Sequence, residues 1–158
     1  MNILIIEDDQ NKIKQLCEFI HRILPSNNII VKNSYQSGVR ELINHLIDCL
    51  VLDMTLPTFD RTPFESGGRI RIYGGKDVLR QIDRKKIQIP VIVVTQFESF
   101  GPSDNKLSLQ QLGQELKSAH PHTFKGIIYY NTTLNNWQNE LESLLLKIKD
   151  EQRGNSDD

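Results

Sequence analysis

Acidic and hydroxyl side chains follow three apolar runs of the sequence, at points where buried strands are expected to give way to loops. Glu7 and Asp8 follow the first run, Asp53 ends the third, and Thr95 ends the fourth. Carboxylates brought together repel one another unless some are protonated or a cation lies among them. Oxygen ligands of this kind suit Mg²⁺, which keeps several waters and usually binds one or two carboxylates directly.

The stretch VLDMTLP (51–57) contains the acid with the clearest chemical role. A carboxylate that faces a metal-bound phosphoryl donor can act as a nucleophile and form an aspartyl phosphate. The hydroxyl of Thr95 can donate a hydrogen bond to a phosphoryl oxygen. These residue types therefore indicate phosphoryl transfer to Asp53 at a magnesium site.

Five short apolar runs, which alternate with amphipathic stretches, are expected to position these side chains. The runs are mostly continuous, as in parallel strands that are covered on both faces. The expected strands are ILII (3–6), NIIV (28–31), CLVLD (49–53), IPVIVVT (89–95) and GIIYY (126–130). The stretches with helical spacing are residues 11–24, 35–47, 76–86, 108–119 and 133–150.

This alternation predicts an α/β fold, a three-layer, doubly wound, parallel five-stranded sheet in the flavodoxin-like order 2-1-3-4-5. In that order the first and third strands are neighbours, so Glu7, Asp8 and Asp53 converge on one pocket. The loop after strand three is enlarged by an insert, residues 58–75, and the region after strand four is also long. We expect one domain over residues 1–150 and a disordered polar tail over 151–158.

Composition and charge exclude several classes of protein. With 158 residues, 38% of them hydrophobic, the chain can bury one sizeable core. A net charge of -1 and a pI near 6.4 give no general attraction to nucleic acid or to an anionic membrane. No signal peptide or membrane span is recognisable, which predicts a cytoplasmic protein. Cys17 and Cys49 lack a metal-ligand spacing and are expected to be reduced core thiols.

The motifs ILIIEDD, LVLDMTLP and IPVIVVT together resemble the receiver domains of bacterial two-component response regulators. The resemblance covers about the first 95 residues well and later returns as a strand-helix pattern. It implies that Asp53 accepts phosphate from a histidine kinase or phosphotransfer protein. It also implies that Asp8, Asp53 and the backbone carbonyl of Thr55 bind Mg²⁺, that Glu7 assists through water, and that Thr95 is the switch hydroxyl.

The sequence departs from the receiver pattern at the end of strand five. The family has a lysine there that contacts the phosphoryl group, whereas GIIYYN places Tyr130 and Asn131 at that point. Tyrosine supplies a hydrogen bond but no charge, so phosphoryl stabilisation should fall about ten- to a hundredfold. Ile127 stands where the family often has an aromatic switch residue, and Gln96 follows Thr95 where a small residue is usual.

Three arginines of the insert are candidates to replace the missing lysine. Arg61, Arg69 and Arg71 lie in a segment expected above the acidic pocket, and arginine recognises phosphate well. More often, arginines of this kind simply solvate a loop or a small hairpin, here one whose short strand is RIRIY and whose turns are marked by glycine pairs.

Three functions are compatible with these residues. The leading one is a stand-alone receiver, not an enzyme, that is phosphorylated on Asp53 and signals to a downstream protein. The second is a pseudo-receiver, an interaction module without productive phosphorylation. The third is a metal-dependent phosphohydrolase. Such an enzyme needs a second acid two residues after the nucleophile, where this chain has Thr55.

The apolar stripe of the final helix, which includes Trp137 and Leu141, is expected to be mostly core. A homodimer through the last two helices is a candidate.

Overall fold

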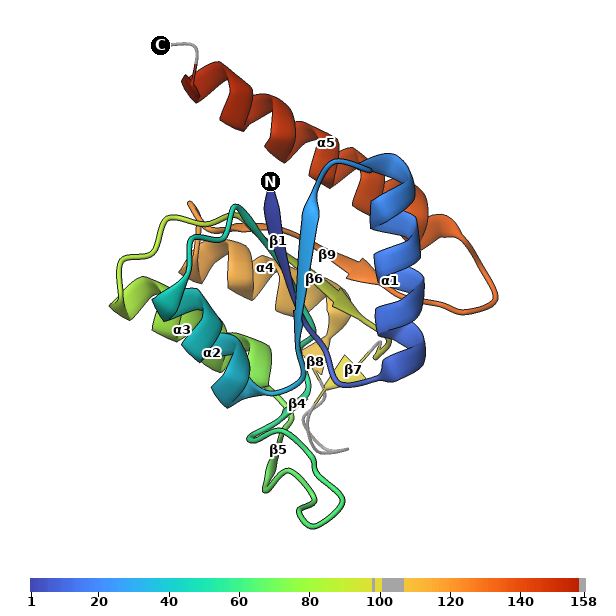
Figure 1. Ribbon diagram of the computed structural model, residues 1–158, viewed down its shortest axis with the longest axis vertical. Coiled ribbons are helices and arrows are strands. Elements are labelled where there is room, and N and C mark those ends of the chain that lie inside the picture. The colour runs from blue at the N-terminus through green and yellow to red at the C-terminus, as the bar shows by residue number, and fades with distance from the viewer. Residues whose placement is uncertain (98, 101–106, 157–158) are drawn as a thin grey trace.

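A parallel five-stranded sheet forms the centre of the computed structural model, which describes residues 1–97, 99–100 and 107–156 (Figure 1). Its strand order is β2-β1-β3-β6-β9, which confirms the predicted order 2-1-3-4-5. The strands are β1 (Asn2–Ile6), β2 (Asn28–Lys32), β3 (Cys49–Leu52), β6 (Val91–Thr95) and β9 (Phe124–Tyr129).

Helices cover both faces of the sheet and complete three layers. The helices are α1 (Gln10–Ile23), α2 (Tyr35–Asn44), α3 (Gly74–Arg84), α4 (Leu109–Ala119) and α5 (Asn136–Ser156). In one core cluster, Leu42 of α2, Val78 of α3 and Leu112 of α4 pack with alternate strand residues. In the other, Leu16 of α1 and Leu141 of α5 pack against the opposite sheet face. Figure 1 shows α1 and α5 together on one side of the sheet.

The pairing of β1 with β3 brings the predicted site residues together. Ile6 is level with Leu52 in this parallel pair, and the backbone N–H of Asp53 donates to the carbonyl of Ile6 at 3.0 Å. Because both strands end at the same edge, the acids that follow them emerge side by side.

The insert after β3 is a hairpin. β4 (Leu56–Pro57) pairs antiparallel with β5 (Ile70–Arg71), as the short-strand interpretation of RIRIY predicted. Gly67 and Gly68 have φ values of 95° and 72°, a region that favours glycine, and they turn the chain back toward β5. In the second enlarged region, β7 (Ser99–Phe100) pairs with β8 (Leu107–Ser108), while residues 98 and 101–106 lie outside the described residues.

The last helix differs from the prediction at both ends. It begins at Asn136 rather than residue 133, which leaves Leu134 outside the helix and 56% exposed. It continues to Ser156, so the expectation of a disordered tail is wrong for residues 151–156, and residues 157–158 lie outside the described residues. One hydrogen bond fixes this extension to the body of the domain: the Gln152 side chain donates to the carbonyl of Asp48 at 2.8 Å.

Across the described residues, no helix has the length and apolar character needed to cross a membrane. Both cysteines are free thiols, and burial raises the pKa of Cys49 to about 12.

Candidate phosphoacceptor and metal site

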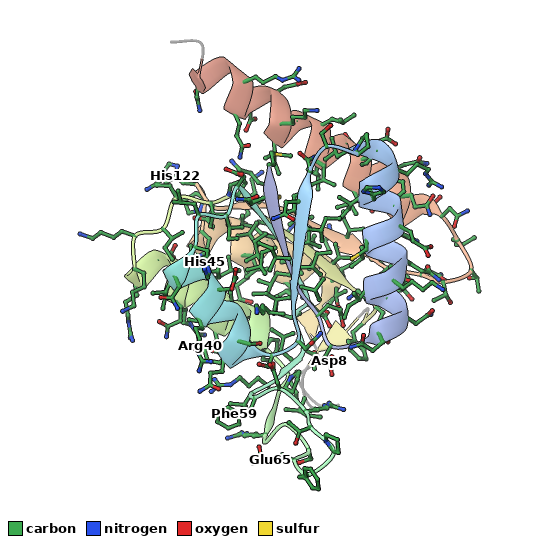
Figure 2. All side chains as sticks on the ribbon, viewed as in Figure 1. Asp8, Arg40, His45, Phe59, Glu65 and His122 are labelled. Carbon is green, nitrogen blue, oxygen red and sulfur yellow. The ribbon has the colours of Figure 1, made fainter. Side chains whose placement is uncertain are left out.

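Three acids meet at the carboxyl ends of β1 and β3, as predicted. Glu7, Asp8 and Asp53 each offer a carboxylate oxygen, and these oxygens lie within 4.8 Å of one another. They line a pocket of about 300 Å³ that is closed on one side by the β4-β5 hairpin. Figure 2 shows Asp8 at the same end of the sheet as the hairpin, which is marked by Phe59 and Glu65. The other lining residues are Asp9, Thr55, Leu56, Pro57, Arg61, Ile70, Gln96 and Phe97.

Asp53 lies in the wall of this pocket and is only 5% exposed. Its Oδ1 atom accepts the backbone N–H of Met54 at 2.8 Å and lies 3.4 Å from the ammonium of Lys12. Among the described residues, none forms a hydrogen bond or ion pair with Asp53 Oδ2. Oδ2 is therefore the oxygen available as a nucleophile.

Glu7 is buried, and its two carboxylate oxygens have different partners. Its Oε1 atom accepts the backbone N–H groups of Asp8 and Asp9 at 3.1 and 3.0 Å, and its Oε2 atom lies 2.5 Å from the ammonium of Lys12. Burial raises the pKa of Glu7, Lys12 opposes that rise, and Asp53 adds to it. Glu7 thus lies against the buried ammonium, and its Oε2 atom accepts no hydrogen bond from the described residues.

Asp8 is the more accessible acid of the pair that follows β1. Burial raises the pKa of Asp8, the guanidinium of Arg61 opposes the rise, and the Asp53 carboxylate adds to it. Arg61 Nη2 lies 3.3 Å from Asp8 Oδ2, and the arginine side chain is 53% exposed. An exposed pair of this kind is weak, so a cation that binds Asp8 could displace the arginine.

The three arginines of the insert have different surroundings. Arg61 reaches the acidic pocket, whereas Arg71 pairs with Asp77 at 3.1 Å and lies over the ring of Tyr35 at 4.2 Å. Arg69 is exposed and lines a different cavity on the hairpin. Of the three candidates, the structure therefore brings only Arg61 to the site.

Thr95 is fully buried at the end of β6, one strand away from Asp53. Its hydroxyl accepts the backbone N–H of Phe97 at 3.3 Å, and Gln96 and Phe97, rather than Thr95, line the pocket. Thr55 lines the pocket, and its hydroxyl donates to the carbonyl of Ile72 at 2.9 Å.

Tyr130 follows β9 and is packed into the core. It is 2% exposed, its ring centroid lies 5.1 Å from that of Trp137, and its hydroxyl donates to Gln15 Oε1 at 2.7 Å. Burial raises the pKa of Tyr130, as do the charges of Asp9 and Glu7, which keeps the hydroxyl protonated as a donor. The Tyr130 hydroxyl is therefore hydrogen-bonded to a residue of α1.

Lys12 is the site residue that sequence reasoning missed. It lies in the first turn of α1, is 1% exposed, and donates from Nζ to the carbonyl of Val94 at 2.7 Å. A signal was present in the sequence, because Lys12, Leu16 and Ile20 recur at four-residue spacing and share the buried face of the helix. A lysine on that stripe indicates an ammonium directed into the protein.

The donor set fits a magnesium ion. Asp8 and the free oxygen of Asp53 are hard, anionic ligands at one edge of the pocket, and the remaining positions can be filled by water and a carbonyl. Glu7 can contribute negative charge nearby, but its oxygens are held by two N–H groups and Lys12.

Comparison with known proteins places this geometry in a family. No family model matches the sequence. The Detocs response regulatory protein DtcB of Enterobacter cloacae is 30% identical over 143 residues, which span 89% of this chain and 95% of that protein.

Solved structures show the same fold. A signal receiver domain from Vibrio parahaemolyticus superposes with a TM-score of 0.67 at 17% identity, over 98% of this chain and 94% of that chain. The receiver domain of a sensor histidine kinase from Pseudomonas aeruginosa, which has a magnesium ion coordinated in its active site cleft, gives a TM-score of 0.60 at 16% identity, over 92% of this chain and 94% of that chain. With its acids at the ends of β1 and β3, this chain belongs to the family of response regulatory proteins that includes DtcB, and its domain is a response regulator receiver.

Proposed function

We propose that the protein accepts a phosphoryl group on Asp53 in a magnesium-dependent reaction and signals through contacts with other proteins. One observation carries the proposal: a nearly buried carboxylate lines a pocket beside two further acids, with Oδ1 held by an N–H group and Oδ2 left free. This arrangement orients one oxygen toward an incoming phosphorus atom.

The transfer step needs a phosphodonor with a good leaving group, such as a phosphohistidine or acetyl phosphate. Oδ2 of Asp53 attacks phosphorus, the bond from phosphorus to the donor breaks, and the donor leaves with the bonding electrons. A bound Mg²⁺ would supply positive charge to the phosphoryl oxygens. Asp8 and Asp53 would hold it, with the Thr55 carbonyl as the third protein ligand. Thr95 is proposed as the switch hydroxyl, which requires its side chain to turn from the Phe97 N–H toward the phosphoryl group.

The partners follow from this chemistry. A histidine kinase or phosphotransfer protein would supply the phosphoryl group, and a downstream protein would read the phosphorylated state, in a cytoplasmic phosphorelay. The match covers 95% of the length of DtcB, a response regulatory protein, and a stand-alone role for this receiver stays a proposal. A homodimer through α4 and α5 also stays a prediction: most of the α5 stripe is buried, and Leu146, at 40% exposure, is its exposed apolar residue.

One set of observations favours the alternative of a pseudo-receiver. Arg61 pairs with Asp8 at the pocket, Thr95 is absent from the pocket lining, and Tyr130 is buried away from it. Such a module would bind its partner without phosphorylation.

Intact-mass measurement decides between these two functions. With Mg²⁺ and acetyl phosphate, the wild-type protein should gain the mass of one phosphoryl group, and Asp53→Asn, which removes the nucleophile but keeps the shape, should gain none. Omission of Mg²⁺ should abolish the gain. A wild-type protein that stays unlabelled by acetyl phosphate and by a phosphorylated histidine kinase, while Asp53→Asn still binds the partner, would establish the pseudo-receiver instead.

A further inference from the structure

We infer that Lys12, on α1, replaces the missing strand-five lysine as the cation that contacts the phosphoryl group on Asp53. This inference rests on the proposed phosphorylation of Asp53 and names the residue that stabilises the transferred group.

The position of the ammonium is the first argument. Lys12 Nζ lies 3.4 Å from Asp53 Oδ1, the oxygen next to the proposed nucleophile. Among the described residues, Lys12 is the one lysine or arginine that is buried, and it forms the one ion pair to Asp53. A cation at this distance, shielded from water, acts strongly on charge that develops at the carboxylate.

The hydrogen-bond capacity of the ammonium is the second argument. A lysine ammonium has three N–H donors. The ammonium donates one hydrogen bond to the carbonyl of Val94 at 2.7 Å, and it forms an ion pair with Glu7 Oε2 at 2.5 Å. The ammonium also lies 3.4 Å from Asp53 Oδ1, which is too long for a good hydrogen bond. An N–H donor is therefore available to a phosphoryl oxygen on Asp53, while the Val94 hydrogen bond and the Glu7 ion pair hold the ammonium in place.

The surroundings of Tyr130 are the third argument. The Lys12 ammonium lies 5.7 Å from the centre of the Tyr130 ring, so the aromatic residue at the end of strand five forms a wall beside the cation. The Tyr130 hydroxyl donates to Gln15, which also lies on α1. Tyr130 after β9 and Lys12 in α1 therefore lie beside each other in the structure.

Neither the helix dipole nor burial favours a lysine at position 12. It occupies the first turn of α1, where the helix dipole disfavours a cation. It is buried at 1% exposure, and a buried ion pair contributes little net stability because desolvation offsets the attraction. A role in holding negative charge at Asp53 accounts for a residue that folding alone does not favour.

Initial rates of labelling by acetyl phosphate test the inference. Lys12→Met keeps the length of the side chain and removes the charge, so we expect labelling to slow by about 10- to 100-fold. Lys14→Met is the matched control, because Lys14 is an exposed lysine of the same helix, and its rate should stay within about twofold of wild type. In the Lys12→Met background, Tyr130→Lys should recover about tenfold, because it returns a cation to the strand-five position.

The outcomes separate this inference from the proposed function. If wild type is labelled and Lys12→Met is labelled at the same rate or faster, Lys12 has no stabilising role and the proposed function survives. If wild type is not labelled, both are rejected.

A second measurement applies if Lys12→Met does not fold, as circular dichroism would reveal. In a crystal structure of the wild-type protein with Mg²⁺ and beryllofluoride on Asp53, Lys12 Nζ should lie within about 3.2 Å of a fluorine. A complex in which Lys12 keeps only Glu7 and Val94, while Arg61 contacts the fluorines, would overturn the inference and assign the role to Arg61.

Discussion

At the residue scale, three acids of similar chemistry have different surroundings, because their hydrogen-bond and ion-pair partners differ. Glu7 has both oxygens engaged, by N–H groups and by Lys12. Asp53 keeps one oxygen free in a nearly buried position, which suits a nucleophile. Within the described part of the chain, Asp8 has one ionic partner, an exposed arginine, which suits a metal ligand that exchanges one cation for another.

Magnesium should therefore stabilise the folded protein through Asp8. At about ten times its dissociation constant, Mg²⁺ should add about 1.4 kcal/mol to the free energy of unfolding, and raise Tm by about 3 to 6 °C. Asp8→Asn should remove most of this shift. The matched control is Asp9→Asn, since Asp9 caps α1 by accepting the Lys12 backbone N–H at 3.1 Å and asparagine caps equally well. Thermal melts with and without Mg²⁺ measure both, and an Asp8→Asn protein with the full wild-type shift would remove Asp8 from the metal site.

At the element scale, the first turn of α3 sets the position of the loop that carries Asp53. The N–H of Gly75 donates to the carbonyl of Met54 at 2.8 Å. A Cβ atom at Gly75 would lie 2.9 Å from the backbone oxygen of Asp53 and 3.1 Å from the Cα of Met54. Those neighbours are backbone atoms, so a side chain at this position must move the helix or the loop.

We expect Gly75→Ala to lower the free energy of unfolding by about 1 to 3 kcal/mol, because the new methyl group overpacks against that backbone. It should also slow the labelling of Asp53. Gly154→Ala is the control in another helix: a Cβ there meets nothing within 4 Å, so stability should stay the same or rise by up to about 1 kcal/mol. Urea denaturation compares the two. Equal stability of Gly75→Ala and wild type would show that the close approach does not constrain the loop.

At the scale of the whole molecule, the sheet could be predicted because its signals are local and repeated. Continuous apolar runs such as ILII and CLVL mark strands that are covered on both faces, and the crossover rule then limits their order. The neighbouring positions of β1 and β3 brought Glu7, Asp8 and Asp53 together as expected.

The features that the sequence did not predict depend on contacts between segments far apart in sequence. Lys12 meets the carbonyl of Val94, 82 residues away, and helical spacing alone does not reveal which partner a buried ammonium has. Residues 151–156 were predicted to be disordered because their composition is polar. Within this segment Gln152 bonds to Asp48, 104 residues away in sequence, a contact that composition does not reveal. The hairpin register that brings Arg61, but neither Arg69 nor Arg71, to the pocket is likewise set by tertiary structure.

The chemical identity of residue 53 after exposure to a phosphodonor tests the central claim most directly. Borohydride reduces an acyl phosphate to an alcohol, so a phosphorylated aspartate is converted to homoserine, which peptide mapping by tandem mass spectrometry can locate. After treatment with Mg²⁺ and acetyl phosphate, we predict homoserine at position 53 and at no other acid, and none when Mg²⁺ is omitted. Recovery of unmodified Asp53 after acetyl phosphate, phosphoramidate and a phosphorylated histidine kinase, or homoserine at Asp8 instead, would contradict the account.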